Sequence, residues 1–149
     1  MNEDKKWMNL AIKEAIKAQE KGEVPVGAII VKNDILLAQS HNETISTNDA
    51  TAHAEVQLIR AAGKKLKNYR LINSTVYVTL EPCAMCLGAM VHARITKIVY
   101  GAYDSKTGVC GSCGDLANST FFKHRINIKG GVQENQCRKL LQDFFKTLR

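Results

Sequence analysis

The sequence has no apolar run long enough to cross a bilayer. Its longest near-continuous apolar stretch, VPVGAIIV, is much shorter than the roughly 20 residues of a transmembrane helix. The first residues, MNEDKKWMNL, are charged and lack an apolar segment, so we expect no signal peptide. Internal repeats, linkers and low-complexity segments are also absent from the 149 residues. We therefore expect one cytoplasmic domain, residues 1–149, with no membrane partner.

Cysteine is scarce, and its odd count of five argues against a disulfide framework. In a reducing compartment these thiols would stay free. Two of them, Cys83 and Cys86, lie three residues apart in the stretch EPCAMC. Such a pair is compatible with a structural metal clip, a redox pair or part of a catalytic metal site.

Acidic residues are outnumbered, with 14 against 21 basic residues and a net charge of +7. This excess suits a polyanionic partner such as a nucleic acid. The cations fall in loose groups, however, and solvated helix faces with cations at helix ends would explain them equally well.

Apolar periodicity predicts an α/β fold. The expected helices are Asp4–Lys21, Ala52–Lys65, Cys83–Ala93 and an amphipathic segment over 137–148. The expected strands are Val26–Val31, Ile35–Gln39, Thr75–Leu80, Lys97–Ala102 and a short one at Ile126–Ile128. The first two strands are predicted to form a hairpin with its turn at Asn33-Asp34. Strands apolar on both sides, with helices between them, indicate a sheet covered on both faces.

Two sets of residues could complete a metal site with Cys83 and Cys86. A second C-x-x-C, at Cys110 and Cys113, would complete a four-cysteine structural zinc site. Alternatively, His53 in the stretch TAHAE would leave a fourth coordination position free, as in catalytic zinc sites.

Glu55 follows His53 by two residues, so the two side chains do not share a helix face. They converge only if the ligand lies over the helix end. A capping box is the alternative for Glu55, but that motif needs Ser or Thr at position 52, which is alanine.

The combination H-x-E and P-C-x-x-C is the signature of zinc nucleobase deaminases. Beyond it, EVPVGAIIV, HNETI, NYRLINSTVYVTLEPCAMCLGAMVHARITKIVYGAYDSKTG and LLQDFF resemble the bacterial tRNA-specific adenosine deaminase family. The similarity runs from Trp7 to Lys146. It implies a cytidine deaminase-like fold, a three-layer α/β/α sandwich with a central mixed five-stranded sheet.

The resemblance implies that His53, Cys83 and Cys86 hold one Zn²⁺ per subunit. It also implies that Glu55 is the catalytic proton shuttle in the hydrolytic deamination of adenosine to inosine, by attack of hydroxide at C6. We expect the pKa of Glu55 to be raised once substrate excludes water. The implied substrate is the wobble adenosine of a tRNA anticodon stem-loop, with no DNA partner.

Six further positions are carried over as substrate contacts: Asn42, Val24, Leu80, Asp104, Lys106 and Phe145. Each also has a plain structural interpretation, as a strand-ending asparagine, an apolar core residue, a polar turn or core packing in the last helix. Glu81 is interpreted as structural.

Two further alternatives stay open. Deaminases of free bases or nucleosides, such as cytosine, guanine or deoxycytidylate, share the metal signature. The third helix, CAMCLGAMVHAR, is apolar around most of its circumference, and the resemblance implies a homodimer that would cover part of it. Burial within one subunit would also explain that pattern.

Overall fold

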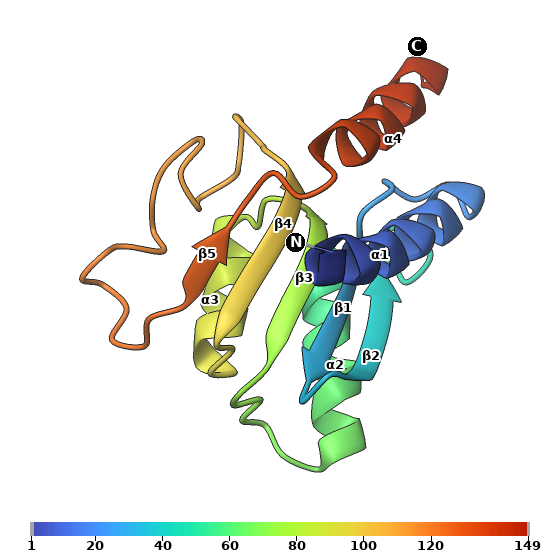
Figure 1. Ribbon diagram of the computed structural model, residues 1–149. Helices are drawn as coiled ribbons and strands as arrows, with labels where there is room; N and C mark the ends of the chain where they lie inside the picture. The colour runs from blue at the N-terminus through green and yellow to red at the C-terminus, as the bar shows by residue number, and fades with distance from the viewer. Residues whose placement is uncertain (1, 149) are drawn as a thin grey trace.

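The computed structural model describes residues 2–148 of the chain. Its helices are α1 (Asn2–Glu20), α2 (Ala54–Leu66), α3 (Ala84–His92) and α4 (Glu134–Thr147). Its strands are β1 (Gly27–Lys32), β2 (Ile35–His41), β3 (Thr75–Leu80), β4 (Lys97–Ala102) and β5 (Asn127–Lys129). The order of elements along the chain is the predicted one, and Figure 1 shows their arrangement.

The strands form one mixed sheet in the order β2-β1-β3-β4-β5. Strand β1 is antiparallel to both β2 and β3, whereas β3–β4 and β4–β5 are parallel pairs. The β1–β2 hairpin turns at Asn33 and Asp34, with φ of 53° and 60°. Positive φ at both turn residues is the geometry of a type I′ hairpin, which Asn and Asp tolerate.

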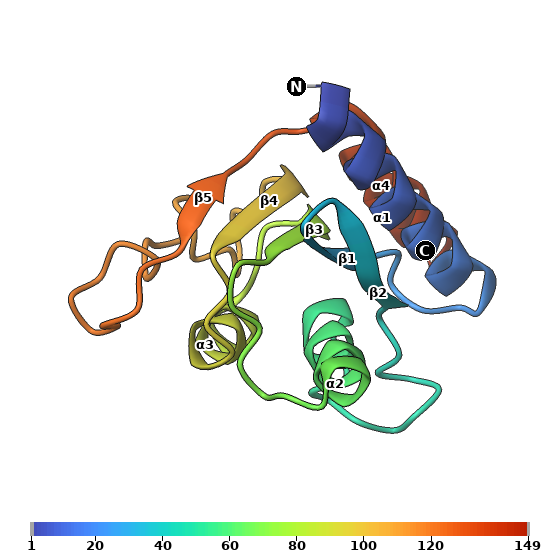
Figure 2. The same cartoon turned by 60° about the horizontal axis from the view of Figure 1, so that its bottom comes forward.

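Helices cover both faces of the sheet, as Figure 2 shows most clearly. Helices α1 and α4 lie on one face, where Met8, Ala11 and Cys137 pack against Ile29 and Val99. Helices α2 and α3 lie on the other face and bury the larger apolar cluster. The predicted three-layer α/β/α sandwich with a mixed five-stranded sheet is therefore confirmed.

Gly27 sets the closest approach between α1 and the sheet. A Cβ atom at this position would collide with the backbone of Ala11 and Ala15 in α1. The Gly27 N–H is also bonded to the Thr79 hydroxyl, at 3.1 Å. Glycine at the start of β1 thus lets α1 lie directly on the sheet.

Strand directions bring several chain segments to one edge of the sheet. The pairing Gly27↔His41 places the start of β1 beside the end of β2. The pairing Leu80↔Ala102 places the ends of β3 and β4 side by side. Helices α2 and α3 begin at the same edge, which is where ligand sites form in sheets with helices on both faces.

The predicted helix bounds differ from the observed ones by up to three residues, the largest difference being at the start of α4. Ala52 and His53 were predicted within the second helix, but α2 begins at Ala54 and His53 is its N-cap. No helix within residues 2–148 has the length and apolarity needed to cross a membrane.

Candidate active site

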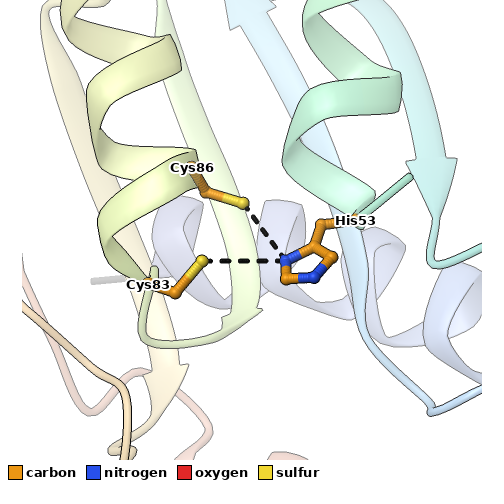
Figure 3. Close-up of side chains that lie close together, drawn as sticks. All are labelled: His53, Cys83 and Cys86. Carbon is orange, nitrogen blue, oxygen red and sulfur yellow. Dashed lines mark hydrogen bonds between the residues drawn. The ribbon is translucent and has the colours of Figure 1, made fainter. Parts of the chain in front are cut away.

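Two helix starts bring together an imidazole and two thiols. His53 is the N-cap of α2 and Cys83 the N-cap of α3, both with extended backbone. Cys86 follows one turn later in α3 and is buried. Figure 3 shows both sulfur atoms facing the His53 ring, with Nδ1 at 3.7 Å from Cys83 Sγ and 3.4 Å from Cys86 Sγ. All three ligand atoms lie within 4.8 Å of one another.

These separations suit a tetrahedral zinc ion. With Zn–S and Zn–N bonds of about 2.3 and 2.05 Å, a tetrahedral angle separates sulfur from nitrogen by about 3.6 Å. The observed distances of 3.4 and 3.7 Å bracket that value. Two thiolates and one imidazole form a donor set that zinc prefers, and three protein ligands leave a fourth position open. The cluster can therefore hold a metal ion as His53, Cys83 and Cys86 were predicted to do.

The four-cysteine alternative is wrong. Among residues 2–148, the group able to hold a metal consists of His53, Cys83 and Cys86. Cys110 and Cys113 are not members of this group: Cys110 forms an isolated bridge with Asp115, and the Cys113 side chain is exposed. The second pair lies in the loop between β4 and β5.

The environment of Cys83 favours its thiolate form. A hydrogen bond from Cys86, assisted by His53, lowers the pKa of Cys83 to about 4 although the residue is partly buried. The N-terminus of α3 also favours a negative charge at this position. A deprotonated thiol is the form that binds a metal ion.

Glu55 lies beside the cluster without belonging to it. It is the second residue of α2 and only 5% exposed. Burial, with a smaller contribution from the negative charge of Cys83, raises the pKa of Glu55 to about 7. The hydrogen bond to its own backbone N–H, the charge of His53 and a hydrogen bond with Cys86 oppose this rise. The expected rise in pKa thus follows from burial in the protein itself. The N-cap of α2 makes no side-chain hydrogen bond, so the capping-box alternative does not apply.

A cavity of about 230 Å³ opens onto His53, Glu55 and Cys83. Four predicted substrate residues line it: Val24, Asn42, Leu80 and Asp104. Several lining residues were not predicted from the sequence, namely Val26, Thr44, Ala54, Glu81 and Thr107. Apolar walls with a few polar groups and one reactive cluster are typical of a small-molecule or base pocket.

Lys106 and Phe145, the other two predicted residues, line a neighbouring cavity instead. The two cavities share Val24, Leu80, Asp104 and Thr107, so the second continues the first outward. Phe145 is 46% exposed, whereas the adjacent Phe144 is buried. Phe145 therefore lies at the surface of α4 and not in the core.

Asp104 is engaged by its own turn. Its carboxylate accepts hydrogen bonds from the backbone N–H groups of Lys106 and Thr107, and from the Thr107 hydroxyl. The carboxylate therefore fixes the shape of this turn. Lys106 makes no such bond through its ammonium group within the described residues, so that group remains open to solvent at the rim.

Helix α3 is buried mainly by its own subunit. Leu87, Met90 and Val91 lie in the core cluster with Cys86. Met85 is exposed. Most of the apolar circumference seen in the sequence is thus covered within one chain.

The chain resembles known deaminases over its whole length. Residues 2–149 match the family described as MafB19-like deaminase. A tRNA-specific adenosine deaminase of Bacillus subtilis (strain 168) is 45% identical over 149 residues, which cover 100% of this chain and 92% of that protein. Another, of Buchnera aphidicola subsp. Schizaphis graminum, is 43% identical over 156 residues, 99% of this chain and 97% of that protein. A solved structure from work on A-to-I editing by tRNA:A34 deaminases at the wobble position matches with a TM-score of 0.88 and 40% identity, covering 91% and 98% of the two chains.

Proposed function

This chain belongs to the family of tRNA-specific adenosine deaminases, and we propose that it deaminates the wobble adenosine of a tRNA anticodon to inosine. The products are inosine at that position and ammonia, with one water consumed. The observation that carries the proposal is the placement of buried Glu55 beside the cluster of His53, Cys83 and Cys86 at one cavity. Full-length identity to enzymes with this name supports the choice of substrate.

The metal in this proposal is one Zn²⁺ per chain, held by His53 Nδ1 and the sulfur atoms of Cys83 and Cys86. When bound, zinc acts as a Lewis acid that makes a water molecule available as hydroxide near neutral pH. The chain's own contribution is to fix the three ligands at the starts of two helices, beside a cavity of about 230 Å³.

Glu55 is the proposed proton carrier. Its carboxylate removes a proton from the attacking water and delivers it to N1 of the base, which makes C6 electrophilic. It then takes the second proton from the hydroxyl group now on C6 and delivers it to the amino group. The amine departs as ammonia, and the oxygen stays on C6 as the carbonyl of inosine. A buried side chain whose pKa lies near 7 is suited both to accept and to donate the proton.

The proposed base pocket consists of Val24, Leu80 and Asn42, which line the inner cavity. The first two offer apolar faces to the adenine ring, and the Asn42 amide offers hydrogen bonds to the nucleotide. Lys106 and Phe145, on the outer cavity, would contact a phosphate and a base next to the target. Asp104 would act there through the shape of its turn.

The target must leave its stack to reach this cavity, which an unpaired anticodon loop permits at least cost. The net charge of +7 would attract the phosphates of the stem. We also propose a cytoplasmic homodimer, with exposed Met85 of α3 in the contact between subunits. Sedimentation at micromolar concentration tests the dimer, because a lone monomer there would rule it out.

The test of the function uses pure protein and four substrates in parallel. These are an anticodon stem-loop with adenosine at the wobble position, the DNA version of that stem-loop, free adenosine, and a mixture of cytosine and guanine. Mass spectrometry scores the gain of about one dalton when an amine is replaced by oxygen. We expect turnover of the RNA stem-loop alone. Turnover of a free base with an inert stem-loop would instead indicate a deaminase of small metabolites.

A further inference from the structure

Two buried carboxylates border the cavity without belonging to the metal cluster. Glu23 is 0% exposed and directly precedes Val24 of the cavity wall. Glu81 is 2% exposed and directly follows Leu80, another wall residue. Carboxylates this deeply buried need strong partners. The partners of both lie in loops that border the cavity.

Glu81 is bonded to the loop formed by residues 104–112. Its Oε1 accepts from the Asp104 N–H at 3.0 Å and the Ser112 hydroxyl at 2.5 Å. Its Oε2 accepts from the N–H groups of Cys110 and Ser112 at 3.0 and 3.1 Å. A Cβ atom at Gly108 would collide with the Glu81 carboxyl carbon, so the loop wraps closely around this side chain.

Glu23 is bonded in the same way to the loop formed by residues 43–48. Its two oxygens accept from the N–H groups of Ile45 and Ser46, at 3.1 and 2.7 Å. Burial alone would raise the pKa of Glu23, but these bonds, with others from the side chains of Ser46 and Thr44, lower it. Thr44 itself lines the cavity.

We infer that Glu23 and Glu81 are positioning residues for the deamination. Each carboxylate holds one loop, residues 43–48 or residues 104–112, in the shape that receives the RNA. Glu81 fixes the turn that carries Asp104 and Lys106, and Glu23 fixes the loop that carries Thr44. The inference rests on the proposed function for its substrate. That the two carboxylates keep the loops structurally ordered in the free protein does not depend on the identity of the substrate.

The physical reason is the entropy of loop ordering. Both loops are short polar segments. In each loop, two or more backbone N–H groups donate to one carboxylate, that of Glu23 or that of Glu81. If that carboxylate were lost, RNA binding would have to order the loop, and the affinity would fall by that cost. The groups proposed for chemistry lie on α2 and α3. The rate of the bound complex should therefore change much less than KM.

Glu81→Gln is the most selective substitution. All four groups bonded to the Glu81 carboxylate are donors, and an amide can accept through only one of its ends. With the amide oxygen at the Oε2 position, the bonds to Cys110 and Ser112 N–H groups are kept. The amide NH₂ then faces the Asp104 N–H but can still donate to the Ser112 hydroxyl. The turn at Asp104 is therefore the part released.

The experiment compares Glu23→Gln, Glu81→Gln and wild type in two measurements. Hydrogen–deuterium exchange should accelerate in 104–112 for Glu81→Gln only and in 43–48 for Glu23→Gln only. With the anticodon stem-loop, each variant should raise KM by about tenfold, as expected for losing a hydrogen bond to a charged group. Zinc content should be unchanged, and kcat should stay within about threefold of wild type.

Asp4→Asn is the matched control, since it also replaces a buried carboxylate by an amide. Asp4 belongs to α1, which lies on the face of the sheet opposite α2 and α3. It should lower stability and leave KM and both loops unchanged. Ser112→Ala removes one of the four bonds to Glu81 and serves if Glu81→Gln does not fold. It should raise KM by about twofold to fivefold.

The inference fails if exchange in both loops matches wild type, or if KM rises no more than in Asp4→Asn. It also fails if Ser112→Ala leaves both KM and exchange unchanged. If wild-type protein does not deaminate the stem-loop, the proposed function fails instead, and the exchange measurement still decides whether these carboxylates order the loops.

Discussion

His53 and Cys86 bring Nδ1 and Sγ to within 3.4 Å across 33 positions of sequence. Both side chains are fixed at the starts of helices that pack on the same face of the sheet. The geometry of the metal ligands therefore depends on helix docking and not on a local loop. A ligand substitution should remove the metal while leaving the sheet and its helices in place.

We expect His53→Ala to lose both zinc and activity. Without the imidazole only two ligands remain, which is too few for a stable site. Elemental analysis should show much less than the roughly one zinc ion per chain expected for wild type. Deamination of the stem-loop should be undetectable. Thermal unfolding should also occur at lower temperature, because bound metal stabilises only the folded state.

The double variant Cys110→Ser with Cys113→Ser is the control. These cysteines lie outside the metal group, so the variant should keep its zinc and full activity. If this double variant lost zinc while His53→Ala retained it, the assignment of ligands would be wrong.

Replacing Glu55 by glutamine tests the proton carrier. The amide fills the same space but cannot take up and return a proton, so kcat should fall by about 10²–10⁴-fold. Zinc content should be unchanged, since Glu55 is not in the ligand group. Single-turnover kinetics on the stem-loop measure the loss, and a rate near that of wild type would refute the role.

The sequence predicted the fold well where local rules apply. Strands Thr75–Leu80 and Lys97–Ala102 were predicted with their observed bounds, because β-branched and aromatic residues fill them. The hairpin at Asn33-Asp34 was predicted from another local rule, since these residues tolerate positive φ. The family resemblance is also confirmed by the comparisons.

Apart from the metal cluster, which the motifs and the family resemblance indicated, features that depend on distant contacts were not predicted. The sequence placed His53 inside a helix, because no capping side chain marks the true start of α2. The bonds from Glu81 to the loop at 104–112 span 23 to 31 residues. No local pattern signals these bonds, and none marks Thr44 and Thr107 as residues of the cavity. The roles of the six predicted substrate contacts stay predictions.

Two adjacent phenylalanines of α4 should respond in opposite ways. Phe145 is exposed at the outer cavity, so Phe145→Ala should weaken stem-loop binding by about 1–3 kcal/mol, the value of one stacked base. Its unfolding free energy should hardly change. Phe144 is buried, so Phe144→Ala should destabilise the fold by about 3–5 kcal/mol. Binding titrations and urea denaturation separate the two effects, and equal loss of stability in both variants would contradict the stacking role.

Stability should fall in acid through Asp4. This carboxylate is buried and would otherwise have a raised pKa, but hydrogen bonds from Lys129 and from Tyr77 at 3.0 Å lower the pKa below 3.8. A group with a lowered folded-state pKa stabilises the protein above its unfolded pKa, and this contribution disappears as the pH falls through the folded value. At neutral pH, Asp4→Asn should cost about 1–3 kcal/mol. The gap to wild type should shrink below about pH 3.8, and urea denaturation showing the same gap at every pH would oppose this assignment.

Binding of the stem-loop should weaken steeply with salt. The chain carries +7 net charge, and each phosphate contact on single-stranded RNA contributes about −0.7 to the slope of log affinity against log salt. Lys106, at the rim of the outer cavity, is the predicted contact nearest the target. Lys106→Ala should therefore reduce the slope by about 0.7 and weaken binding of stem-loops of different sequence to the same extent.

Lys32→Ala is the control, because Lys32 lies at the opposite end of β1 from the cavity, and it should leave the slope unchanged. Fluorescence anisotropy at several salt concentrations measures both slopes, and an affinity independent of salt would exclude phosphate contacts as the main source of binding.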